Sequence, residues 1–156
     1  MKVLTADQMG YVDRTTIERG VPGIELMRNA GSAVYEFIAE TLGISRKAGI
    51  VVLAGRGNNG GDGFRVAELL VRNGFDTEVY LVGKKTDVSG DAAVCMKDAE
   101  AGGMKVTEIT GENDIDRLSE KLMFVGIIVD ALFGTGLKGE ITGLSAAIID
   151  SVNSSE

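Results

Sequence analysis

One stretch of the chain, residues 51–63, constrains the fold more than any other. It reads Val-Val-Leu-Ala-Gly-Arg-Gly-Asn-Asn-Gly-Gly-Asp-Gly, so an apolar run stops abruptly at a segment rich in glycine, asparagine and aspartate. We predict a buried strand over Ile50–Ala54, a tight glycine loop, and a helix over residues 63–73. Glycine lets a backbone approach a ligand closely, and a helix N-terminus presents unpaired N–H groups that favour anions. The stretch therefore predicts a nucleotide-type binding fold.

Strand-like and helix-like segments alternate through the rest of the chain. Strands are predicted at residues 50–54, 77–82, 105–109 and 124–129, and helices at residues 63–73, 92–101, 114–121 and 143–152. Such alternation is typical of right-handed βαβ units and of a parallel sheet with helices on both faces. Two helices come first: Thr5 and Gln8 fit a capping box for a helix over Ala6–Glu18, and apolar spacing predicts another over residues 24–42. We therefore predict an α/β fold.

The composition excludes several kinds of chemistry. The 156 residues include no histidine and one cysteine, Cys95, which rules out an internal disulfide, zinc sites of thiolate or imidazole ligands, and Ser–His catalysis. The formal net charge of −7 argues against nucleic acid as a partner. No apolar run approaches the length of a membrane span, and the single cysteine fits a reducing compartment. We expect no membrane partner and a cytoplasmic protein.

Three predicted strand ends hold the residues suited to binding and chemistry, because ligands of an open α/β sheet bind at the carboxyl ends of its strands. Gly55-Arg-Gly-Asn-Asn-Gly60 matches the spacing of a dinucleotide-binding loop. Lys84 and Lys85, however, stand where that pattern requires an acidic residue after the next strand. Asp130 ends an apolar run, where a buried carboxylate is costly unless a cation or hydrogen-bond donors compensate it. A second glycine loop follows it.

Each of these residues also has a purely structural interpretation. Asp62 could cap the following helix, and Asn58 and Asn59 could simply tolerate left-handed turn geometry. Lys84 and Lys85 could be ordinary solvated surface charge. The coincidence of several polar, glycine-rich strand ends at one edge of one sheet favours a binding site over these alternatives.

Several segments resemble a known family. They are Leu4-Thr-Ala-Asp-Gln-Met9, Asp13, Leu26-Met27-Arg-Asn-Ala-Gly31, residues 55–63, and Asp130-Ala-Leu-Phe-Gly-Thr-Gly-Leu-Lys-Gly139. Along almost the whole chain they resemble the YjeF N-terminal domain, the NAD(P)HX epimerase or apolipoprotein A-I-binding protein family. The resemblance implies a Rossmann-like three-layer α/β/α sandwich, usually a homodimer. It also implies interconversion of the R and S epimers of hydrated NADH and NADPH (NADHX and NADPHX) in cofactor repair, functionally linked to an NAD(P)HX dehydratase.

The resemblance further implies which residues form the site. The implied substrate contacts are Asn58, Asn59, Gly60, Gly61 and Asp62, together with Gly134, Thr135, Gly136, Leu137, Lys138, Gly139 and Glu140. Asn59 and Asp130 are the implied ligands of a potassium ion, and their amide and carboxylate oxygens suit a hard cation. For proton transfer on the hydrated nicotinamide ring we favour Asp130 first and Lys84 second. We expect Asp62 to orient the substrate at a helix N-terminus.

The family pattern and this sequence differ at the C-terminal end. In the family, the last helix leads into a strand ending in Asp-Ile/Val-Pro-Ser-Gly, which supplies a further substrate aspartate and potassium ligand. The sequence stops at Glu156, so we expect one domain, residues 1–156, lacking its last strands. The alternative function is a non-catalytic nucleotide-ligand-binding or scaffolding module of the same fold. A flavodoxin-like redox carrier would need aromatic residues beside the glycine loops, where only Phe64 and Phe133 stand.

Overall fold

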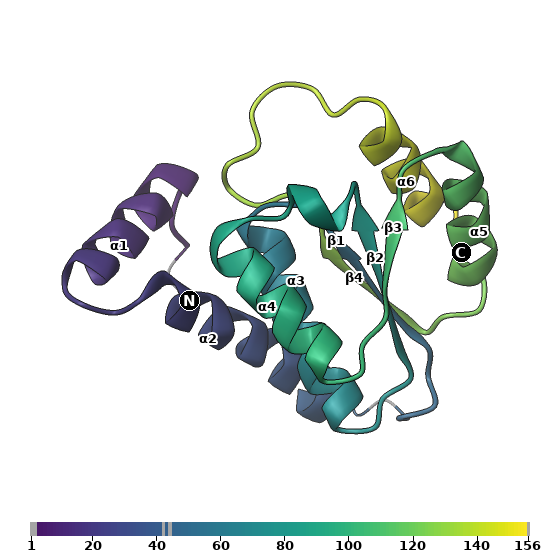
Figure 1. The fold of residues 1–156 in the computed structure, drawn as a ribbon, viewed down its shortest axis with the longest axis horizontal. Coiled ribbons are helices and arrows are strands. Elements are labelled where there is room, and N and C mark those ends of the chain that lie inside the picture. The colour runs from purple at the N-terminus through teal and green to yellow at the C-terminus, as the bar shows by residue number, and fades with distance from the viewer. Residues whose placement is uncertain (1–2, 42, 44, 156) are drawn as a thin grey trace.

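The computed structural model describes residues 3–41, 43 and 45–155, and within them the chain forms a four-stranded parallel sheet (Figure 1). The strands are β1 (Ile50–Ala54), β2 (Thr77–Val82), β3 (Val106–Ile109) and β4 (Ile127–Ala131). Their order across the sheet is β3-β2-β1-β4. The chain therefore winds from β1 in one direction to β2 and β3, then returns to place β4 on the other side of β1. Ligands of open α/β sheets bind at such a switch point, here between β1 and β4.

Helices cover both faces of this sheet (Figure 1). They are α1 (Ala6–Glu18), α2 (Gly23–Glu36), α3 (Asn58–Arg72), α4 (Gly90–Ala101), α5 (Glu112–Leu122) and α6 (Leu144–Asn153), with a π-helical turn at Phe37–Thr41 and a 3-10 turn at Lys85–Asp87. Alternate residues of β1 enter two cores: Val52 packs with the α3 and α4 side, and Val51 with the α5 and α6 side. The predicted three-layer α/β/α sandwich with two extra N-terminal helices is confirmed.

The predicted boundaries differ in how well they match the structure. The bounds of α1, β1 and β2 agree with prediction, and Thr5 and Gln8 form the expected capping box. The prediction for β4 was wrong at both ends, because Phe124 is 82% exposed and the strand runs from Ile127 to Ala131. The helix predicted over residues 24–42 changes to π-helical geometry at Phe37. Its last predicted residue, Leu42, lies outside the described residues.

The first helix stands apart from the cores. The structure describes every residue of α1, and none of them is buried. The helix lies to one side of the sheet in Figure 1 and contacts α2. The apolar stripe predicted on α2 is only partly covered, since Met27 is buried whereas Val34 is exposed. None of the helices described in the structure has the length and apolarity that crossing a membrane requires.

Candidate active site

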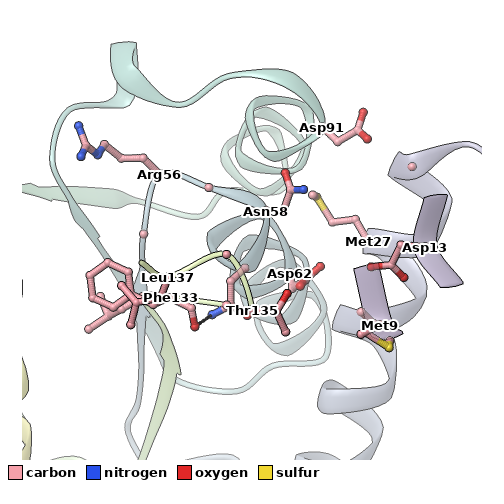
Figure 2. A pocket seen from close by; sticks show the side chains of 18 of the residues that line it. Met9, Asp13, Met27, Arg56, Asn58, Asp62, Asp91, Phe133, Thr135 and Leu137 are labelled. Carbon is pink, nitrogen blue, oxygen red and sulfur yellow. Dashed lines mark hydrogen bonds between the residues drawn. The ribbon is translucent and has the colours of Figure 1, made fainter. Parts of the chain in front are cut away.

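A cavity of about 1220 Å³ lies at the switch point of the sheet. It is lined by the segment that joins β1 to α3, by residues 132–138 after β4, and by the end of β2. Side chains of α1 and α2 close it on another side (Figure 2). The volume exceeds the few hundred to about 1,000 Å³ of an ordinary small-molecule pocket, so it is large enough for a ligand of dinucleotide size.

The glycine-rich stretch after β1 is helical, where the sequence predicted a loop. Helix α3 begins at Asn58 with Gly57 as its N-cap, five residues before the predicted start. The capping interpretation of Asp62 was therefore wrong, as was its expected place at the helix N-terminus, because Asp62 lies in the second turn. The amides of the first turn, at Asn58 and Asn59, line the cavity instead.

Close packing is the reason for glycine in this stretch. None of the described glycines between residues 55 and 63 has a positive φ. A Cβ on Gly55 would lie 2.1 Å from the Leu132 carbonyl oxygen, and one on Gly60 would lie 1.9 Å from the Gly55 carbonyl oxygen. A Cβ on Gly61 would lie 2.4 Å from the sulfur of Met27. These glycines bring α3 against its own strand, the segment after β4 and helix α2.

One hydrogen bond joins the two glycine-rich segments. The Asn59 side-chain amide Nδ2 donates to the carbonyl oxygen of Phe133 at 3.0 Å. Gly134 follows at once, and a Cβ there would lie 3.2 Å from the Asn59 Cβ. The first turn of α3 and the start of residues 134–139 are therefore in direct contact across the switch point.

Acidic side chains from three helices reach the cavity. Asp62 comes from α3, Asp13 from α1 and Asp91 from α4. Burial, together with the smaller effect of the negative charge of Asp13, raises the pKa of Asp62 from its ordinary value of 3.8 to about 6. In the part of the chain that the structure describes, neither Asp13 nor Asp62 forms an ion pair with a basic side chain. Asp62 can therefore hold a proton close to neutral pH.

Asp130 and Lys84 lie outside the residues that line the cavity. Asp130 is within β4, opposite Leu53, and it is exposed. The predicted burial of Asp130 was wrong because β4 is an edge strand of the described sheet; its Oδ1 accepts a hydrogen bond from the Leu132 backbone N–H at 2.9 Å. Lys84 is exposed just before the 3-10 turn. The neighbouring Lys85 forms an ion pair with Glu100 at 2.7 Å.

The matching family is the YjeF-related protein N-terminus, whose model matches residues 23–156. The chain belongs to this family. A bifunctional NAD(P)H-hydrate repair enzyme of Moorella thermoacetica is 38% identical over 98% of this chain and 29% of its own length. The NAD(P)H-hydrate epimerases of Rhodopirellula baltica and Oenococcus oeni are 33% and 36% identical over 97% of this chain, which spans 60% and 68% of their lengths.

A solved structure of the same fold is that of yeast ynu0, which superimposes with a TM-score of 0.82. It is 23% identical and covers 97% of this chain and 65% of its own. At that identity the likeness shows the fold alone. The chain thus spans between about a third and two thirds of the length of these relatives.

The residues that the YjeF resemblance implied for substrate binding divide into three groups. Those that line the cavity are Asn58, Asn59, Asp62, Gly134, Thr135, Gly136, Leu137 and Lys138. Gly60 and Gly61 are buried behind it in α3, and Gly139 and Glu140 are exposed beyond its lining. Within the described residues, no group of three or more acidic, histidine or cysteine side chains could hold a metal ion.

Sequence reasoning missed several residues that line the cavity. Met9, Asp13 and Ile17 come from α1, and nothing in the helical periodicity of that segment indicates that it faces the site. Met9 and Asp13 were indicated only through the family resemblance, without a role in the site. Arg56 stands at a position that the spacing of the glycine-rich loop leaves unspecified. Figure 2 shows it on the opposite side of the cavity from Asp13, and it pairs with Asp87 at 3.8 Å.

Proposed function

We propose that this chain is an NAD(P)HX epimerase, an isomerase that interconverts the R and S forms of hydrated NADH and NADPH. One observation supports this most directly: the Asn59–Phe133 hydrogen bond joins two glycine-rich segments around a cavity of about 1220 Å³. The relatives from Rhodopirellula and Oenococcus carry the name NAD(P)H-hydrate epimerase. The proposed substrate contacts are those that line the cavity: Asn58, Asn59, Asp62, Gly134, Thr135, Gly136, Leu137 and Lys138.

The polarity of the cavity supports an orientation for a dinucleotide. The first turn of α3 offers backbone N–H groups, and Arg56 adds a positive charge, so this end suits phosphate. The opposite end combines Met9 and Met27 with the carboxyls of Asp13 and Asp62, and it suits an uncharged ring. We propose that the hydrated nicotinamide lies at this second end.

A potassium ion is part of the proposal, with Asn59 and Asp130 as its protein ligands. The donor set fits such an ion, because amide and carboxylate oxygens suit hard cations and both residues lie beside the switch point. The Asn59 amide nitrogen is engaged by Phe133, which leaves its oxygen for the ion. When bound, the ion would supply positive charge next to the phosphate-binding segment.

We propose a homodimer, working with an NAD(P)HX dehydratase in the cytoplasm. Exposed apolar side chains on α1, on α2 and on the π-helical turn that follows it, among them Tyr11, Val12, Val34 and Phe37, support an interface between two copies. The link to a dehydratase is supported by the name of the bifunctional Moorella relative. The buried free Cys95 suits a reducing compartment such as the cytoplasm.

The test is conversion of purified R-NADHX to the S form by this chain, followed by chromatography with and without potassium chloride. The proposal expects catalysed conversion, and faster conversion with potassium than with the same concentration of tetramethylammonium. Asn59→Leu, which removes both the Phe133 contact and the proposed ion ligand, should abolish it. Asn113→Leu is the same change on the exposed surface of α5. It is the matched control and should leave the conversion of NADHX unchanged.

The same protein sample separates catalysis from simple binding. Circular dichroism establishes that each variant is folded, and calorimetric titration with NADP⁺ measures nucleotide binding. A folded chain that binds NADP⁺ without converting NADHX would contradict the epimerase proposal and favour the scaffolding or ligand-binding module.

A further inference from the structure

Two carboxylates meet in the cavity from helices on opposite sides. Asp62 projects from the second turn of α3, and Asp13 projects from α1. Figure 2 shows both side chains directed into the same space, beside the thioethers of Met9 and Met27. Burial raises the pKa of Asp62, and the negative charge of Asp13 acts in the same direction. Like charges in an apolar setting favour retention of a proton by one member of the pair.

The remaining charges around Asp62 do not neutralise this pair. Helix α2 contributes Leu26, Met27 and other uncharged residues to the cavity. Helix α4 contributes a further carboxylate, Asp91, and the segment after β4 contributes the cation of Lys138. The segment before α3 contributes Arg56, whose guanidinium pairs with Asp87. Among the ion pairs formed by described residues, none involves Asp13, Asp62 or Lys138. The proton on the pair therefore has no fixed protein partner and is available to a ligand.

We propose that Asp62 is the catalytic acid–base residue of the epimerisation and that Asp13 is a positioning residue whose negative charge strengthens the binding of a proton by Asp62. This inference rests on the proposed epimerase function and moves proton transfer from Asp130 and Lys84, which lie outside the cavity lining, to a carboxyl inside it. Asp62 combines the three properties that the role needs: access to the cavity, partial burial, and a neighbouring negative charge.

The proton balance of the step is simple. Protonated Asp62 donates its proton to the hydroxyl on C6 of the hydrated nicotinamide ring, and the C6–O bond breaks as water leaves. The lone pair of the ring nitrogen forms a double bond to C6. Water then adds to the other face of C6, the electron pair returns to nitrogen, and the surplus proton of the added water returns to Asp62. No oxidant, reductant or further reactant is consumed.

The roles of the two residues predict different kinetic effects. Asp62→Asn removes the proton donor, and kcat should fall by about 100-fold or more. In wild-type protein the rate should decline as the pH rises through about 6, where Asp62 loses its proton. Asp13→Asn removes a charge that raises the pKa of Asp62, so the decline should begin at lower pH than in wild-type protein.

Asp7→Asn is the matched control, because it removes the same charge from an exposed position on the same helix. It should leave the pH profile of wild-type protein unchanged. The inference is overturned if Asp62→Asn retains more than about a tenth of wild-type kcat, or if Asp13→Asn and Asp7→Asn give the same pH profile. Either result leaves the epimerase function itself intact, because wild-type conversion is measured beside them.

A second measurement does not depend on turnover. Carboxyl ¹³C NMR of the wild-type chain and of Asp13→Asn follows the titration of Asp62 directly. The inference expects the Asp62 midpoint to fall in the variant, and an unchanged midpoint would overturn the pairing. If the wild-type chain converts no NADHX, the proposed function and the catalytic role fail together, and this titration still decides whether Asp13 controls the proton on Asp62.

Discussion

The α3 side of the cavity and the α1 side are held in place by very different means. Helix α3 has eight buried residues, and its glycines touch the backbone of the neighbouring segments. Helix α1 buries none of its residues, all of which the structure describes. Its stability is local and comes from the capping box of Thr5 and Gln8. One side is fixed by the core, and the other is a helix supported mainly by itself.

This difference has a consequence for the chemistry. The groups that must be placed accurately, at Asn58, Asn59 and Asp62, belong to the fixed side. Asp13 belongs to the loosely packed side, and it acts over a distance through charge, which tolerates small displacements better than a hydrogen bond does. The arrangement suits a site in which one helix holds the reacting carboxyl and another sets its proton affinity.

The largest expected effect on stability comes from truncating a fully buried side chain of α3. Phe64 has no exposed surface, and Phe64→Ala should lower the free energy of unfolding by about 3–5 kcal/mol through lost burial and the cavity left behind. Tyr11→Ala, on α1, removes an aromatic ring that is 65% exposed, so the free energy of unfolding should change by no more than about 0.5 kcal/mol. Urea unfolding followed by circular dichroism measures both. Similar losses in the two variants would break the comparison between the helices.

A second pair of variants tests why glycine is required at the start of α3. A Cβ at Gly60 would lie 1.9 Å from a backbone carbonyl oxygen that cannot move aside alone, so Gly60→Ala should cost about 3 kcal/mol. Gly57 has open space around it and a negative φ, so Gly57→Ala should cost about 0.5 kcal/mol or less. Urea unfolding followed by circular dichroism measures both losses. Equal losses would show that the glycines are not there for packing.

The fold was predictable where local signals and tertiary packing agree. The apolar runs of β1 and β2 stop at Gly55 and Gly83, and both strands were predicted to the residue. The start of α3 was missed because three glycines and two asparagines among residues 58–63 disfavour a helix, by about 1 kcal/mol for each glycine. The contacts of Gly60 and Gly61 with other segments override that propensity. The apolar run before β4 is longer than the strand, so periodicity alone could not locate its start.

The candidate site was predictable on one side of the cavity. Glycine-rich strand ends indicated Asn58, Asn59 and the segment after β4; Asn58, Asn59 and residues 134–138 line the cavity, whereas Gly139 and Glu140 do not. The contribution of α1 depends on how a connected helix folds back over the site, and no local pattern encodes that. The predicted burial of Asp130 is wrong for a related reason: an apolar run predicts a buried strand, whereas β4 lies at the edge of the described sheet.

The charge on Asp62 should destabilise the folded chain near neutral pH. Its native pKa, about 6, lies above the ordinary value of 3.8, so the native state binds the proton more tightly and stability falls as the pH rises between these values. Asp62→Asn should remove that fall and raise stability at pH 7 by about 1 kcal/mol after solvent screening is allowed for. Unfolding at pH 4 and pH 7 measures the difference. An equal gain at both pH values would contradict the ionisation argument.

The smallest effect concerns the local stability of α1. Thr5→Ala removes the N-cap side chain, which should weaken the helix by about 1 kcal/mol and speed amide hydrogen exchange in its first turns about fivefold. The global free energy of unfolding should hardly change, because α1 buries no residue. Thr16→Ala is the matched control, because the Thr16 hydroxyl caps no helix end and donates its hydrogen bond to the Val12 carbonyl oxygen of the preceding turn. Alanine is the better helix former there, so exchange should slow or stay the same. If Thr5→Ala instead lowered global stability as much as local stability, α1 would be part of the same cooperative unit as α3, and the two sides of the cavity would move together.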